Sequence, residues 1–177
     1  MQNISKVKKL SVIMQFFCTA LMLLLPLLII WIWVDFKNYA HTLSRPNVLI
    51  DLQYIHTNQI IIAATLQLMS LAVLVYGLWH LRSLFKLFHN AVFFTREAIN
   101  HLNKFTLALF ISALLKPIVK MLLSVLLTWG NPPGQKALLV ELGSSEVSMI
   151  FISGILLTIT WIMREGQQLE HENKSFV

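Results

Sequence analysis

The sequence predicts an all-α membrane protein, a four-transmembrane-helix bundle that forms one domain over residues 1–177. Of the 177 residues, 56% are hydrophobic and 12% are charged, whereas a soluble domain carries about 25% charged residues. Four apolar stretches are each long enough to cross a bilayer, which takes about 20 helical residues. All five tryptophans lie at or near the ends of these stretches, where indole rings favour the membrane interface.

The four stretches define the predicted spans, at residues 10–34, 60–79, 105–129 and 147–163. The first is longer than the apolar region of a signal peptide, which has about 7–15 residues, and no small-x-small site follows it, so we expect a retained anchor. The last span is the shortest. The polar residues before it, Ser144, Ser145 and Glu146, suit a capped helix start.

The basic residues predict the orientation of the chain in the membrane. Of the 14 Lys and Arg residues, nine fall in the N-terminal segment, the loop over residues 80–104 and the C-terminal tail, and three fall in the loops over residues 35–59 and 130–146. The positive-inside rule therefore predicts that both termini and the 80–104 loop are cytoplasmic. We expect a multi-pass protein of the plasma membrane, surrounded by the lipid bilayer.

The cytoplasmic loop has helical patterning in its first part. Apolar residues recur there at three- and four-residue spacing, at Leu81, Leu84, Phe85 and Phe88, so the second helix should continue to about Phe88. Thr95 can cap the next helix. One interpretation is a solvated helical hairpin whose apolar stripes pack together. The other is a basic face for anionic lipid or for a soluble cytoplasmic regulator, formed by Arg82, Lys86, Arg96 and Lys104.

The outer loops contain two segments that could form short strands. The prolines within residues 131–135 end the third helix, because proline cannot continue it. Residues 136–142, which follow, and residues 48–54 are both rich in β-compatible side chains. These segments could pair as a two-stranded outer cap.

Several sequence motifs are similar to those of one protein family. The segments LRSLFKLF (81–88), FTREAINHL (94–102) and NPPGQ (131–135), and the tail motifs MREG (163–166) and ENKSFV (172–177), resemble the bacterial membrane family called domain of unknown function 2975. The resemblance covers most of the chain from about residue 60 onward. Asn90 and Ala91 depart from it, since a glycine turn is expected there.

The resemblance implies an integral protein of the bacterial inner membrane with four helices and no established activity, and it supplies no catalytic residues. Some members are encoded beside small helix-turn-helix regulators, which implies pairing with a cytoplasmic regulator.

Two lysines in the middle of the third span are chemically unusual. Lys116 and Lys120 are four residues apart and so share one helix face. Insertion of a lysine at the centre of a span costs about 2.5–3.5 kcal/mol, so both need compensation. Pro117 removes one backbone N–H and should kink the helix. Further polar groups on or opposite this face are Ser112, Ser124 and Gln67, and the candidate counter-ions are Asp35, Asp51, Glu141 and Glu146.

Two interpretations of the lysines stay open. In the first, they face a narrow hydrated cleft and are satisfied by carbonyl groups, loop carboxylates or water. In the second, Lys116 and Lys120, with Gln67, Ser112 and Ser124, form a site for an anionic small molecule or lipid headgroup, or part of a permeation path.

Other chemistries lack their motifs in this sequence. The histidines have no zinc-ligand spacing, and each is expected to be exposed or interfacial. No nucleophile elbow, P-loop or dinucleotide turn is present. We therefore predict a protein that is not an enzyme, has no metal or cofactor and binds no nucleic acid.

The leading prediction for function is a regulatory or sensory interaction module with a polar intramembrane site on the third helix. The alternative is a small transporter or channel component for an anionic solute or lipid. Gly154 and Thr158 form a small-xxx-small pair, which could seat a neighbouring helix within the bundle or a second copy of the chain.

Overall fold

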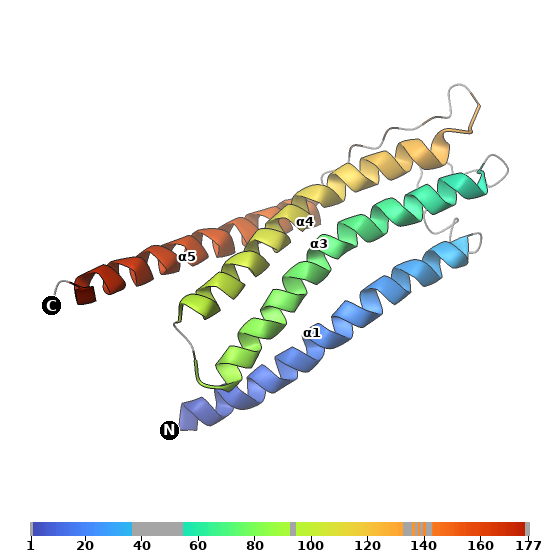
Figure 1. Cartoon of the computed structure of the whole chain (residues 1–177). Helices are drawn as coiled ribbons and strands as arrows, with labels where there is room; N and C mark the ends of the chain where they lie inside the picture. Colours follow the sequence, from blue (N-terminus) through green and yellow to red (C-terminus); the bar gives the residue numbers. More distant parts are fainter. Residues whose placement is uncertain are drawn as a thin grey trace.

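The chain forms four long helices (Figure 1). The structure is a computed structural model, and it describes residues 2–36, 55–92, 95–132, 136, 138, 140 and 143–175. The helices are α1 (Gln2–Val34), α3 (Thr57–His89), α4 (Arg96–Thr128) and α5 (Ser144–Ser175). Each contains a stretch that is long and apolar enough to cross a membrane. The prediction of an all-helical chain with four apolar helices is therefore confirmed.

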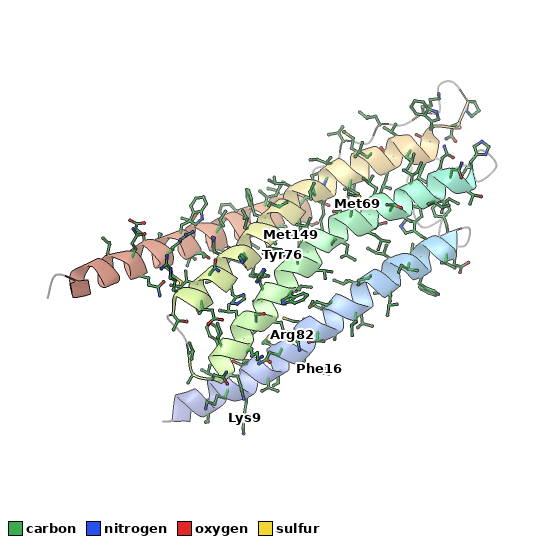
Figure 2. All side chains as sticks on the ribbon, in the orientation of Figure 1. Lys9, Phe16, Met69, Tyr76, Arg82 and Met149 are labelled. Atoms are coloured by element: carbon green, nitrogen blue, oxygen red, sulfur yellow. The ribbon has the colours of Figure 1, made fainter. Side chains whose placement is uncertain are left out.

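The helices lie in a row that follows the order of the chain. The main contacts are those of α1 with α3, α3 with α4, and α4 with α5. Figure 1 shows the start of α1, the turn between α3 and α4 and the end of α5 at one end of the row, which we call the hairpin end. The row buries only 11–22% of each candidate span. Apolar side chains such as Phe16 and Met69 therefore remain exposed on its surface, where a membrane would cover them (Figure 2).

The α3–α4 hairpin closes with a turn that usually uses glycine. The helix α3 ends at His89, one residue beyond the predicted end, and the Thr95 hydroxyl accepts a hydrogen bond from the Ala98 N–H at 3.3 Å, as predicted for a cap. After α3, the Val92 and Ala91 N–H groups donate to the Leu87 and Phe88 carbonyls at 3.1 and 3.0 Å. This is the Schellman pattern, whose central residue is left-handed. Ala91 occupies that position with φ of 62°.

The contact between α3 and α4 depends on a small residue. A Cβ atom on Gly77 would lie 3.0 Å from the Ala108 Cβ atom, so glycine permits the close approach of the two helices. Nearer the hairpin end, the Nδ1 atoms of His80 and His101 are 2.9 Å apart. One ring must donate and the other must accept, so at least one imidazole carries no charge in this geometry. We expected exposed or interfacial histidines; these two instead pair between the helices.

The contact between α1 and α3 is polar at two points. Near the end opposite the hairpin, the Trp33 Nε1–H donates to Gln67 Oε1 at 2.7 Å, and the Trp33 ring stacks on Phe36 with 5.2 Å between the ring centroids. Nearer the hairpin end, the Gln15 side-chain amide donates to the Phe85 carbonyl at 3.2 Å. These bonds fix how far α1 is shifted along α3.

The last helix and the predicted outer cap remain to be compared with the sequence. The helix α5 covers Ser144–Ser175, so it contains the predicted span at residues 147–163 and continues beyond both of its ends. The described residues contain no strand. Residues 48–54 lie outside them, and residues 136, 138 and 140 have no regular structure, so the outer cap is unsupported.

Replacing Ala91 with glycine should stabilise the protein by about 1 kcal/mol, because a left-handed conformation costs a residue with a Cβ atom about that much. The measurement is the thermal unfolding midpoint of the detergent-solubilised protein. Asn90→Gly is the control, since Asn90 has φ of −82° and gains nothing from glycine. An equal midpoint for Ala91→Gly and wild type would contradict the strained turn.

Gly77→Val should destabilise the protein by about 1–3 kcal/mol, the usual range for overpacking a close contact. The added atoms would press on Ala108 and Phe105. Gly166→Val is the matched control, because a Cβ atom there would meet no heavy atom within 4 Å. Thermal unfolding of both variants checks this, and equal losses of stability would argue against a close α3–α4 contact at Gly77.

Candidate functional site

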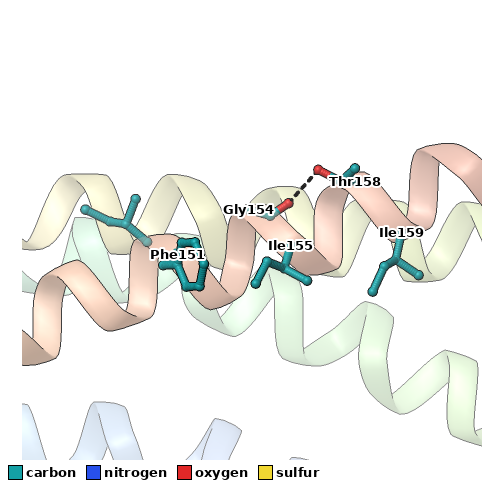
Figure 3. A pocket seen from close by; sticks show the side chains of 6 residues that line it. Phe151, Gly154, Ile155, Thr158 and Ile159 are labelled. Carbon is teal, nitrogen blue, oxygen red and sulfur yellow. Dashed lines mark hydrogen bonds between the residues drawn. The ribbon is translucent and has the colours of Figure 1, made fainter.

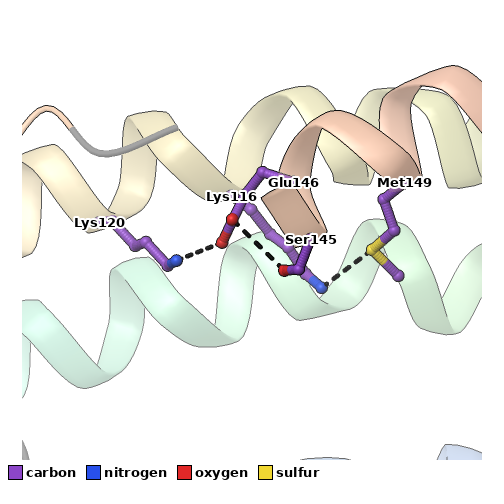
Figure 4. Close-up of polar contacts among 5 residues, drawn as sticks. All are labelled: Lys116, Lys120, Ser145, Glu146 and Met149. Carbon is purple, nitrogen blue, oxygen red and sulfur yellow. Dashed lines mark hydrogen bonds and ion pairs between the residues drawn. The ribbon is translucent and has the colours of Figure 1, made fainter. Parts of the chain in front are cut away.

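The helix α5 begins beside the middle of α4, not beside its end. The Lys120 ammonium group is paired with the Glu146 carboxylate, and the Lys116 Nζ atom lies 3.3 Å from the Met149 Sδ atom (Figure 4). Beyond Lys120, α4 continues to Thr128, a further rise of about 12 Å. The lysines that sequence analysis put in the middle of a span therefore face the first two turns of the next helix.

Glu146 is held on both carboxylate oxygens. Its residue is 7% exposed, Oε1 accepts from the Lys120 Nζ atom, and Oε2 accepts from the Ser145 hydroxyl at 3.3 Å. A Cβ atom on Gly143 would lie 2.7 Å from Oε2, so a glycine at that position leaves room for the carboxylate. Glu146 was one of four candidate counter-ions, and the structure brings it to Lys120.

Of the other three candidates, Asp51 and Glu141 lie outside the described residues, and Asp35 lies just beyond the end of α1.

Lys116 has a much weaker partner. Its side chain is exposed on the surface of the row, and the Met149 thioether is a weak acceptor without charge. Lys116, Lys120 and Glu146 therefore bring together two positive charges and one negative charge between α4 and α5. We call these three residues the lysine site. Its net charge of about +1 attracts an anion.

The other predicted ligand residues do not join the lysine site. Gln67 Oε1 accepts a hydrogen bond from the Trp33 Nε1–H of α1, and no bond from Gln67 to either lysine is seen among the described residues. Ser112 and Ser124 are buried, and their hydroxyls donate to the Leu109 and Met121 carbonyls of α4 itself.

Two further features concern Pro117 and the groups that could bind a metal ion. The helix α4 is continuous through Pro117, and a kink there stays a prediction. Among the described residues, no group of three or more His, Cys, Asp or Glu side chains could hold a metal ion.

The predicted basic face lies at the hairpin end. Arg82 and Lys86 are exposed in the last turns of α3, Arg96 is exposed at the start of α4, and Lys104 is half-buried. Figure 2 shows Lys9 of α1 toward this same end of the row.

The Gly154–Thr158 pair lines a shallow apolar hollow on α5 (Figure 3). Its other walls are Ile150, Phe151, Ile155 and Ile159. The Thr158 hydroxyl donates to the Gly154 carbonyl at 3.0 Å, so the hydrogen of this hydroxyl is already used within α5. None of the residues that line this hollow is charged, in contrast to the lysine site.

Sequence analysis missed two residues that border the lysine site, Met149 and Gly143. Met149 resembles any other apolar residue of its span, so no local signal marks it. Gly143 precedes the polar run Ser144, Ser145 and Glu146, and a glycine there was a usable signal for a crowded helix start.

The comparisons with known proteins agree with the sequence motifs. The model of the family described as "Protein of unknown function (DUF2975)" matches residues 10–177. The chain belongs to this family. The match confirms the resemblance and extends it back to residue 10, so that it includes most of α1. Neither the curated proteins nor the solved structures contain a match.

Glu146→Gln should lower the thermal unfolding midpoint, because it leaves the exposed Lys120 ammonium group in the apolar part of a candidate span without its counter-charge. Adding Lys120→Met to Glu146→Gln should recover part of the loss, since the unpaired ammonium group is then removed. Glu165→Gln is the matched control, as Glu165 is an exposed carboxylate on the same helix. A double variant no more stable than Glu146→Gln would mean that the ion pair does not stabilise the α4–α5 contact.

Proposed function

We propose that the protein is a non-enzymatic sensory or regulatory module of the bacterial inner membrane that binds an anionic group at the lysine site. One observation carries this proposal. In the described part of the chain, the hydrogen-bond partner of the Lys116 ammonium group is the uncharged thioether of Met149. An ammonium group within a span costs about 2.5–3.5 kcal/mol without compensation. Lys120 has Glu146 to offset that cost, whereas no carboxylate among the described residues pairs with Lys116. A bound anion would supply the missing charge.

The surroundings of the lysine site favour binding over permeation. A transporter or channel component would need polar groups that continue along the α4–α5 contact toward the hairpin end. The buried hydroxyls next along α5 are those of Ser153 and Thr160. They donate to the Met149 and Leu156 carbonyls at 2.7 and 2.8 Å, so their hydrogens serve their own helix. This argues for a ligand that stays at the site.

The hairpin end suits a role in signalling to the cytoplasm. The excess of basic residues in the segments that meet at this end supports a cytoplasmic orientation by the positive-inside rule. Arg82, Lys86 and Arg96 are exposed there, and such a surface fits anionic headgroups or an acidic patch on a cytoplasmic regulator. The long helix α5 joins the lysine site to this end.

The proposal is tested by identifying what the protein retains on extraction from membranes. Lys116→Met should lower the amount of anionic compound that copurifies, measured by native mass spectrometry, by at least about tenfold, which corresponds to about 1.4 kcal/mol of binding free energy. Lys6→Met is the matched control, because Lys6 is an exposed lysine at the start of α1 and is not part of the basic face or of the lysine site. Equal retention by Lys116→Met and Lys6→Met would overturn an anion site at Lys116.

A further inference from the structure

We infer that the anion at the lysine site is the singly charged head of a membrane lipid, which reaches Lys116 from the side of the row, and that Glu146 sets the charge that the site accepts. This inference rests on the proposed function and names the class of ligand. It follows from the position of the site at the edge of the row, from the level at which α5 begins, and from the count of charges.

The lysine site opens sideways. The helix α5 is the last of the row and packs mainly on α4, so one side of their contact faces the surroundings of the protein. Lys116 is exposed on this side together with Met149, which is 36% exposed, and Ile152, one turn farther along α5, is 55% exposed. Apolar side chains therefore border the ammonium group. They offer a surface to an acyl chain and no polar groups to a hydrated ion.

The start of α5 brings the polar boundary of the membrane close to Lys116. On α5, the polar residues Ser144, Ser145 and Glu146 give way to the apolar run at Val147, and Lys116 faces Met149 just beyond this change. A lysine can extend its ammonium group toward the polar side while its alkyl stem stays among apolar atoms. A lipid head at the level of the first turn of α5 can therefore meet Lys116 without entering the middle of the bilayer.

The charges at the site favour one negative charge on the ligand. Lys116 and Lys120 contribute about two positive charges and Glu146 one negative charge, which leaves about +1 in a region of low dielectric constant. A phosphodiester head such as that of phosphatidylglycerol neutralises this charge. A phosphomonoester carries about −1.5 to −2 at pH 7 and leaves an excess negative charge. A zwitterionic head leaves the excess positive charge in place.

The test is a competition among lipids on the full chain in detergent, read by native mass spectrometry. Wild type should retain phosphatidylglycerol at least about tenfold better than phosphatidic acid or phosphatidylcholine. Glu146→Gln raises the site to about +2 and should reverse the order of the two anionic lipids. Lys120→Met lowers it to about zero, and retention of phosphatidylglycerol should fall to that of phosphatidylcholine. Glu165→Gln should behave as wild type.

Each contrary result has its own meaning. An unchanged lipid order in both Glu146→Gln and Lys120→Met would overturn the role of Glu146, and either variant alone suffices if the other does not fold. Displacement of phosphatidylglycerol from wild type by millimolar inorganic phosphate would overturn the lipid as the source of the anion while leaving the proposed function intact. Equal binding of every probe by wild type and Lys116→Met would overturn the proposed function as well.

Discussion

The arrangement of α4 and α5 depends on the ion pair between Lys120 and Glu146. A charge in an apolar region must be neutralised or moved out, and Lys120 is eight residues from the end of α4. Its carboxylate partner is in the first turn of α5. The pairing therefore fixes the level at which α5 begins. Because α5 starts there, Met149 is the residue that faces Lys116, and no described carboxylate pairs with that lysine.

Each contact along the row combines apolar packing with one specific feature. Trp33 and Gln67 join α1 to α3, Gly77 lets α3 approach α4, and Lys120 with Glu146 joins α4 to α5. Between apolar helices in lipid the hydrophobic effect gives little preference for one helix neighbour over another, so close packing and polar pairs decide the arrangement. Few side chains are buried between the helices of this row. Its arrangement therefore depends more on these features than the arrangement of a protein with a compact core does.

The sequence predicted what local patterns determine. The lengths of the apolar runs gave the four helices, and the spacing of Leu81, Leu84 and Phe88 gave the extension of α3. Which helices touch depends on residues far apart in the chain. Sequence analysis offered Gln67 as a polar group opposite the lysines but did not identify Trp33 as its partner. Glu146 was one of four carboxylates that could have met the lysines, because local sequence carries no information on the offset between α4 and α5.

The described residues of the site include two lysines and one carboxylate. This ratio limits the cost of placing charges in a membrane and leaves one positive charge for the proposed anion. If each lysine had its own carboxylate, the site would be neutral and would have no net attraction for an anion. If neither had one, two like charges four residues apart would repel each other as well as carry the full cost of insertion. With Glu146 on Lys120, the first turn of α5 is anchored and a single charge is left at Lys116. Lys120, which pairs with Glu146, and Lys116, which carries the charge of the proposed anion site, thus share one face of α4.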